Sequence, residues 1–160
     1  GVHYKNLSIL VHPSSYVHAL IKLKTGLIKL IAHETDMKIP IYNTLEDIIN
    51  KKIFTKKIEI EKLNNLDLQN IDKKKFPLTN LLKILPNKIS LFETVIVSAN
   101  DELVNLFLNN KIKFTDISKQ LFKIINNKKF SKFKRISPKN VSQILKLNNY
   151  VRLKINSKSI

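Results

Sequence analysis

The sequence predicts an α+β fold, in which a short strand and a β-hairpin from a mixed sheet precede an all-helical C-terminal bundle. Apolar and polar residues alternate over residues 16–33 around Gly26, a pattern typical of a hairpin. After residue 76, apolar residues recur with the three- and four-residue spacing of amphipathic helices. The chain has 160 residues, 43% of them hydrophobic, and no cysteine. A chain of this size can bury a core without disulfides.

The first elements are predicted from apolar runs and from the residues that interrupt them. Residues 7–11 are interpreted as a buried strand, because Pro13 follows and cannot continue a β-ladder. Residues 16–24 and 27–33 are predicted as the two strands of the hairpin. Gly26 supplies the turn, where a left-handed conformation costs a glycine little.

One face of this hairpin needs a covering layer. Leu20, Leu27 and Ile31 make its second face partly apolar, so we expect that face to pack on a helix layer or on a second subunit. A helix is predicted over 41–50, and 51–75 is interpreted as a surface connection with one or two short strands.

Five helices are predicted in the second half of the chain. Thr115 or Asp116 is expected to cap the third helix, Ser137 followed by Pro138 the fourth, and Asn148 the last. The first two helices are expected over 78–85 and 90–109, and the apolar residues of the others are Ile117, Leu121, Ile124, Ile125, Val141, Ile144, Leu145, Val151 and Ile155.

Several classes of function are excluded by residues that the chain lacks. Without cysteine there is no disulfide, no thiolate nucleophile and no cysteine-based zinc or iron–sulfur site. Gly1 and Gly26 are the two glycines, so the sequence holds neither a P-loop nor the glycine-rich dinucleotide fingerprint. No apolar run approaches the roughly 18–20 residues of a membrane span. We therefore expect no membrane partner.

The net charge of +17 does not by itself indicate a nucleic-acid partner. Of the 29 basic residues, Arg135 and Arg152 are the two arginines, and the rest are lysines. Lys, Asn and Ile are the residues that AT-rich codons encode, so we attribute the charge to genome composition. The planar guanidinium of arginine forms paired hydrogen bonds to phosphate and guanine, which the ammonium of lysine does not. No nucleic-acid partner is expected, and a basic nucleic-acid-binding module stays as an alternative hypothesis.

The histidines of the hairpin region are the first candidates for chemistry. His12 and His18 lie close in sequence, and His33 can return beside them across the hairpin. A metal site needs such ligands together with carboxylates and second-shell partners. We favour a structural role at strand ends, and we interpret Glu34 and Asp36 as a solvated strand end or a helix cap. No metal ligands are assigned in this chain.

The remaining polar motifs favour surface roles. Ser15 has no His–Asp pair at a useful spacing, so nucleophilic catalysis is unsupported. Residues 100–102 (Asn-Asp-Glu) fall in the middle of a predicted helix and are expected on its solvated face. The lysine clusters at 73–75 and 128–134 are also interpreted as solvated surface.

Six segments, taken together and in this order, resemble the C-terminal part of the 1-deoxy-D-xylulose 5-phosphate reductoisomerase family. The family pattern is a strand ending in H-P-x-S-x-x-H, a hairpin with a central Gly, P-D-M-x-x-P-I, Y/F-P, L-N-A-A-N-E and F-L-x-x-x-I-x-F-T-D-I. Thr35 stands where the family has Pro, Val97 where it has Asn, and Asp101 where it has Glu. The segments are ILVHPSSYVH (9–18), TGLIKLI (25–31), DMKIPI (36–41), FP (76–77), SANDE (98–102) and NLFLNNKIKFTDI (105–117).

The resemblance implies a role in an enzyme of non-mevalonate isoprenoid biosynthesis. That enzyme converts 1-deoxy-D-xylulose 5-phosphate to 2-C-methyl-D-erythritol 4-phosphate with NADPH and with Mg²⁺ or Mn²⁺. The resemblance implies that residues 1–45 end the catalytic domain, 46–75 connect, and 76–160 form the C-terminal helical domain. The NADPH domain, the phosphate-binding set and the metal ligands are expected upstream of Gly1, so the isolated 160-residue chain is predicted to be inactive.

Three residues carry the site that the resemblance implies. Ser15 and His18 are expected on the active-site wall, and Met37 beside the nicotinamide of NADPH, where Thr35 alters the expected contact. The resemblance also implies a homodimer formed through the sheet region. The expected location is the cytoplasm of a bacterium with an AT-rich genome, or alternatively a plastid. The rival hypothesis is a stand-alone, non-catalytic interaction or relic protein descended from this enzyme.

Overall fold

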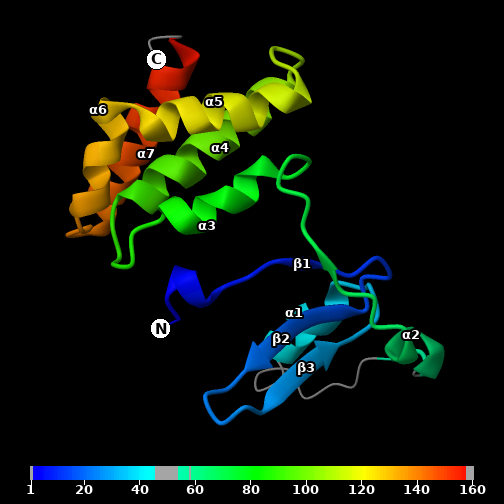
Figure 1. Cartoon of the computed structure of the whole chain (residues 1–160). Helices are drawn as coiled ribbons and strands as arrows, with labels where there is room; N and C mark the ends of the chain where they lie inside the picture. Colours follow the sequence, from blue (N-terminus) through cyan, green and yellow to red (C-terminus); the bar gives the residue numbers. More distant parts are fainter. Residues whose placement is uncertain (1, 46–53, 58, 158–160) are drawn as a thin grey trace. The chain divides into compact units, whose positions relative to one another are not determined.

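The computed structural model describes residues 2–45, 54–57 and 59–157, and the chain forms two compact units (Figure 1). The sheet unit comprises Ile9–Ile71. The helical unit comprises Gly1–Ser8 together with Asp72–Ile160. The α+β prediction is confirmed, since the strands lie in the first unit and the long helices in the second. In the described part of the chain, no helix is long and apolar enough to cross a bilayer.

The predicted hairpin is confirmed. Strands β2 (Val17–Lys22) and β3 (Ile28–Ala32) pair antiparallel, with Leu20 opposite Leu30. Gly26 has φ +88° in the turn, and its amide donates to the carbonyl of Leu23 at 3.0 Å. That backbone conformation is strained for any residue with a Cβ, which explains the glycine. The pairing register shifts between Val17 and Ala19, so the strict alternation predicted for residues 16–24 is broken near the start of β2.

The predicted strand over residues 7–11 is shorter and more exposed than expected. Strand β1 (Leu10–Val11) pairs antiparallel with β4 (Gln69–Asn70), and this partner offers only two residues for pairing. The prediction of burial is wrong, because Leu7, Ile9 and Leu10 are all exposed. Strand β4 confirms the short strand expected within 51–75, whereas helix α2 (Ile60–Asn64) was not predicted.

Helix α1 (Lys38–Leu45) begins three residues before the predicted start. The Asp36 carboxylate accepts a hydrogen bond from the Lys38 amide at 2.9 Å, and the Asp36 carbonyl accepts one from the Ile39 amide. Pro40 lies in the first turn, where no intrahelical N–H is required. The Asp36 carboxylate therefore acts at a helix start, one of the two roles expected for it. Residues 46–50 of the predicted helix lie outside the described residues.

The helical unit packs around α4 (Phe92–Leu108), against which α5 (Phe114–Asn126) and α7 (Val141–Asn156) lie (Figure 1). The predicted helix over 78–85 is present as a 3₁₀ turn, Pro77–Asn80, continued by α3 (Leu81–Ile84). A further 3₁₀ turn spans Tyr4–Asn6. The predicted apolar face of α5 is confirmed, whereas Val141 and Leu145, expected on an apolar helix face, are exposed. The core contains residues of α4, α5 and α7 together with Phe130: Phe92, Val95, Ala99, Leu103, Ile117, Leu121, Ile124, Ile125, Phe130, Leu147, Val151 and Ile155.

Three predicted helix starts are wrong. The residues expected to form a fourth and a fifth helix form the single helix α7, whose N-cap is Asn140 rather than Ser137. Asn140 accepts from the Gln143 amide at 2.9 Å, while Asn148 lies inside the helix. Helix α5 is preceded by Lys113, whose amide donates to the Asp116 carboxylate from outside the helix. Asp116 therefore stabilises this helix start from within the first turn and does not occupy the cap position.

A short helical stretch was not predicted at all. Helix α6 (Lys128–Ser131) and a 3₁₀ turn, Lys132–Arg135, follow α5 directly. Phe130 anchors them, because its side chain is buried in the core. The ammonium of Lys134 lies 4.8 Å from the centre of the Phe92 ring, so part of this lysine cluster covers the core.

Candidate functional site

His12 organises the turn that precedes β2. Its ring is buried, and its Nδ1 accepts hydrogen bonds from the backbone amides of Tyr16, at 3.1 Å, and Val17, at 3.0 Å. A nitrogen that accepts carries no proton, so the neutral ring holds its hydrogen on Nε2, which lies 3.2 Å from Ser14 Oγ. His12 therefore has the structural role favoured by the sequence.

Ser15 is held in a strained turn. Its φ is +52°, a value that non-glycine residues seldom adopt, and its amide donates to the His12 carbonyl at 2.8 Å. The side chain is exposed. The Ser15 amide is held by the His12 carbonyl, and the amides of the next two residues, Tyr16 and Val17, are held by the His12 imidazole. These three hydrogen bonds keep the backbone of Ser15 in its strained conformation and so fix the position of its side chain.

His18 and His33 meet across the hairpin. Their rings stack with centroids 3.6 Å apart and an interplanar angle of 2°. His33 Nδ1 also donates to the carbonyl of Glu34. The structure thus brings together two of the three histidines considered, while His12 is occupied by backbone amides. Within the described residues, no group of three histidine, aspartate or glutamate side chains is arranged to hold a metal ion.

Met37 immediately precedes α1 and is 66% exposed. The thioether therefore meets no partner in the hydrophobic core of the described chain. Ser15, His18 and Met37 all lie in the sheet unit, and all three are exposed. These three side chains are accessible to a ligand or to another part of a larger protein.

A small polar pocket lies in the same unit. Its volume is about 110 Å³. Lys62 Nζ lies 2.8 Å from Glu59 Oε2, and the hydrogen bond to this carboxylate raises the pKa of Lys62. With two carboxylates and two ammonium groups, the pocket carries no net excess of charge and is too small for a nucleotide. Its lining residues are Ser14, Tyr16, Glu34, Thr35, Lys56, Glu59 and Lys62.

The prediction of a solvated face for residues 100–102 is wrong for Glu102, which is buried. Its two carboxylate oxygens accept from Arg152 Nη1 at 3.1 Å and from Asn156 Nδ2 at 2.9 Å, both on α7. Asp101 remains exposed and binds the second guanidinium nitrogen of Arg152 at 3.0 Å. Sequence patterns gave no signal for this cluster, because its partners lie about fifty residues apart in the chain.

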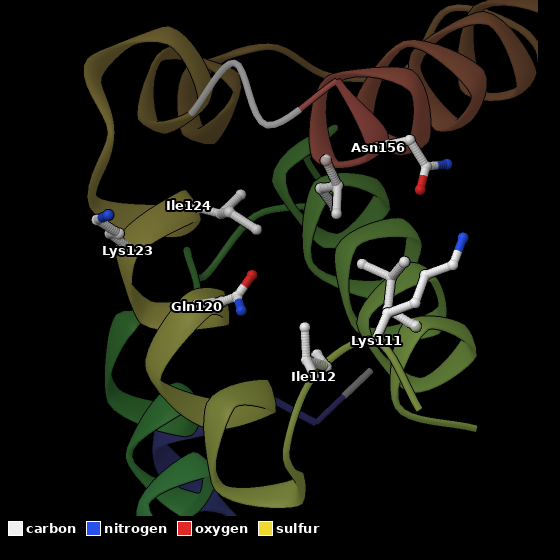
Figure 2. A pocket seen from close by; sticks show the side chains of 8 residues that line it. Lys111, Ile112, Gln120, Lys123, Ile124 and Asn156 are labelled. Carbon is white, nitrogen blue, oxygen red and sulfur yellow. The ribbon is translucent and has the colours of Figure 1, made fainter. Parts of the chain in front are cut away.

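A larger pocket lies within the helical unit, beside α4, α5 and α7. Its volume is about 640 Å³. Figure 2 shows Gln120 and Ile124 of α5 on one side of it, Lys111 on the other, and Asn156 at the end of α7. No pattern in the sequence marked these residues as a group, because three separate segments contribute them.

Comparison with known proteins places the chain in a family. Residues 33–154 match the family model described as the DXP reductoisomerase C-terminal domain. The chain is 54% identical over all 160 residues to the 1-deoxy-D-xylulose 5-phosphate reductoisomerase of Pelagibacter ubique, covering 41% of that protein.

Solved structures show the same relation. The reductoisomerase of Zymomonas mobilis in complex with NADPH superimposes with a TM-score of 0.72 and 26% identity, over 96% of this chain and 39% of that one. A DOX-P reductoisomerase with NADPH, fosmidomycin and magnesium has the same fold, with a TM-score of 0.77 over 93% of this chain and 38% of its own. The chain thus spans about two fifths of the length of the relatives it matches. It belongs to the 1-deoxy-D-xylulose 5-phosphate reductoisomerase family and corresponds to the C-terminal portion of its members.

Proposed function

We propose that this chain works as part of an NADPH-dependent reductoisomerase that converts 1-deoxy-D-xylulose 5-phosphate to 2-C-methyl-D-erythritol 4-phosphate in isoprenoid biosynthesis. The observation that carries the proposal is the 54% identity to the Pelagibacter ubique enzyme over the whole chain. In this role, residues 1–45 end the catalytic domain, 46–75 connect, and 76–160 form the helical domain. We also propose a cytoplasmic location.

The chain's own contribution is to shape one wall of the active site. His12 fixes the turn through the two backbone amides that it accepts, and this turn presents Ser15 with its left-handed backbone. His18 is held against His33 by ring stacking. In the proposed enzyme, Ser15 and His18 face the substrate, and the exposed thioether of Met37 packs against the nicotinamide. These residues position and shield the reactants.

The residues present do not fit a complete site for either cofactor. Among the described residues, no three metal-binding side chains converge, and the whole sequence contains two glycines. Metal chelation and phosphate binding by backbone amides both require such groups. The proposal therefore assigns NADPH and Mg²⁺ or Mn²⁺ to the three fifths of the enzyme that this chain does not span, and no chemical step is routed through them here.

We further propose that the hairpin supports a homodimer. Both of its strands expose large apolar side chains, which is unusual for a surface that stays in water. Leu27, which immediately precedes β3, and Ile28, its first residue, are among the most exposed apolar residues of the hairpin. Leu27→Lys and Ile28→Lys should convert a dimer into monomers in sedimentation velocity, whereas Leu153→Lys, an exposed apolar residue of α7, should not. Equal sedimentation of all variants would contradict this interface.

A chimera tests the function. The region of the Pelagibacter ubique enzyme that matches this chain is replaced by residues 1–160, and NADPH oxidation is followed with 1-deoxy-D-xylulose 5-phosphate as substrate. We expect turnover. Met37→Ala should raise the KM for NADPH by roughly tenfold, because about 1.4 kcal/mol of contact with the nicotinamide is lost. Met37→Leu should restore most of the affinity.

The control variant is Leu145→Ala, which shortens an exposed side chain on α7 and should leave the KM unchanged. A chimera that folds and binds NADPH but gives no product would refute the proposed function. An active chimera in which Met37→Ala leaves the KM for NADPH unaltered would instead refute the role of Met37 alone.

A further inference from the structure

The larger pocket of the helical unit has the size of a small-molecule site. At about 640 Å³ it falls within the roughly 300–1,000 Å³ typical of ligand pockets. Its lining divides into an apolar part and a polar part, which is the usual composition of a site that binds and orients an organic ligand. The apolar side chains are Leu106, Ile112, Ile124 and Ile155, and the polar ones are Lys111, Gln120, Lys123 and Asn156.

The charge of this lining is positive. Lys111 and Lys123 both contribute, no carboxylate lines the pocket, and neither ammonium forms an ion pair with a described residue. Glu102 is bound by Asn156, but its charge is already compensated by Arg152 at 3.1 Å. The positive charge of the two lysines is therefore available to a ligand.

Lys111 is held in place by the end of α4. Its amide donates to the Leu106 carbonyl at 2.8 Å, and the Asn110 amide donates to the Phe107 carbonyl at 2.9 Å. With Asn110 at φ +57°, these bonds form a Schellman motif, which closes the helix and fixes the residue that follows. The backbone of Lys111 is thus preorganised at the edge of the pocket, so a ligand need not order it.

We propose that this pocket binds a small amphiphilic anion, an unbranched or branched alkyl body with one carboxylate or phosphate head. The alkyl body packs against the three isoleucines. The head accepts hydrogen bonds from the Lys111 ammonium on its side of the pocket, and Lys123, on the α5 side, adds positive charge to the lining (Figure 2). The site is independent of the proposed reductoisomerase activity, because it lies wholly in the helical unit and uses neither the substrate nor NADPH.

Octanoate serves as the probe. It is titrated into the ¹⁵N-labelled 160-residue chain, and we expect saturable shifts of the amide signals of Lys111, Ile112, Gln120 and Ile124. K111Q/K123Q should weaken octanoate binding at least about tenfold, the loss expected when the charged hydrogen bonds of the head are removed. The control K119Q/K146Q removes the same charge from α5 and α7 outside the pocket and should bind like the original chain.

Two comparison probes separate the contributions of the charged head and the alkyl body. Inorganic phosphate carries charge without an alkyl body, and 1-octanol carries the body without charge, so each should bind more weakly than octanoate. The proposal is overturned by absence of saturable binding to the folded chain, by equal weakening in both lysine pairs, or by phosphate or octanol binding as tightly as octanoate. If K111Q/K123Q fails to fold, Ile112→Glu, which adds a repelling carboxylate to the lining, must abolish binding.

Discussion

The partly buried ion pair between Glu102 of α4 and Arg152 of α7 gives the sharpest test of how the helical unit is stabilised. Arg152 binds two neighbouring carboxylates with the same guanidinium: Glu102, whose side chain is 8% exposed, and Asp101, which is 48% exposed. The two distances are nearly equal, at 3.1 and 3.0 Å. Glu102→Gln and Asp101→Asn therefore form a pair that differs in burial and in the additional hydrogen bond that Glu102 accepts from Asn156.

The magnitudes follow from the surroundings of each group. Glu102→Gln weakens the hydrogen bonds made to a buried charge and should lower the free energy of unfolding by about 1–3 kcal/mol. Asp101→Asn removes an exposed pair and should cost about 0.2–1 kcal/mol. Arg152→Met leaves the buried Glu102 carboxylate with Asn156 as its remaining hydrogen-bond donor. The free energy of unfolding should fall by about 2–4 kcal/mol. This loss is smaller than for a fully buried pair, because the Arg152 side chain is partly exposed.

The measurement is urea unfolding of the chain and the variants, followed by far-UV circular dichroism, which reports the helices. The midpoint should fall in the order Asp101→Asn, Glu102→Gln, Arg152→Met, with the denaturant slope unchanged. In the double variant Glu102→Gln/Arg152→Met, the losses should be less than additive by about 1–2 kcal/mol.

Two results would refute this reasoning. If Asp101→Asn costs as much as Glu102→Gln, burial does not decide the strength of these bonds. If the coupling between Glu102 and Arg152 is below about 0.5 kcal/mol, the pair does not hold α4 and α7 together.

Further predictions concern both units. Ser98 Oγ is buried without a hydrogen-bond partner among the described residues, so Ser98→Ala should raise the Tm by an amount equivalent to about 1 kcal/mol in calorimetry; a lower Tm would reveal an unseen partner. His12→Ala should abolish the hydrogen-exchange protection of the two amides that it accepts, at a cost of about 1–3 kcal/mol; retained protection would exclude its role in the turn. The hydrogen bond from Lys62 to Glu59 raises the Lys62 pKa above its ordinary value of 10.5. The stabilisation that this bond gives the folded chain is therefore present below pH 10.5 and is lost as the pH rises through the raised pKa. In a ¹³C NMR titration, Glu59→Gln should lower the Lys62 pKa, and an unaltered titration would contradict the assignment. The purified 160-residue chain should oxidise no NADPH with 1-deoxy-D-xylulose 5-phosphate, and measurable turnover would show that it holds complete cofactor sites.

Local patterns predicted the elements whose formation depends on neighbouring residues. The hairpin follows from a two-residue alternation and one glycine in a turn that only glycine adopts without strain. The buried faces of α4 and α5 follow from helical spacing, because these helices bury one continuous stripe. The role of Asp116 was only half predicted, since a carboxylate can stabilise a helix start either at the cap or from the first turn.

The candidate site was predicted by resemblance and not by local chemistry. Ser15, His18 and Met37 carry no distinguishing pattern of their own, and only the order of the surrounding motifs pointed to them. The stacking of His18 on His33 depends on the register of the hairpin, including its shift between Val17 and Ala19. A one-residue difference in register moves side chains to the opposite face, and sequence spacing does not fix it.

The sequence by itself determined the α+β class, the hairpin, the main helices and the family, because these depend on periodicity and on the order of motifs. Only the tertiary structure decided which polar residues are buried. Glu102 reads as a surface residue until Arg152, fifty positions later, is brought against it. Lys111, Gln120 and Lys123 form a pocket with Ile155 only once α7 closes on α4 and α5. Burial and charge pairing are properties of the packed chain, so residues distant in sequence had to meet before either existed.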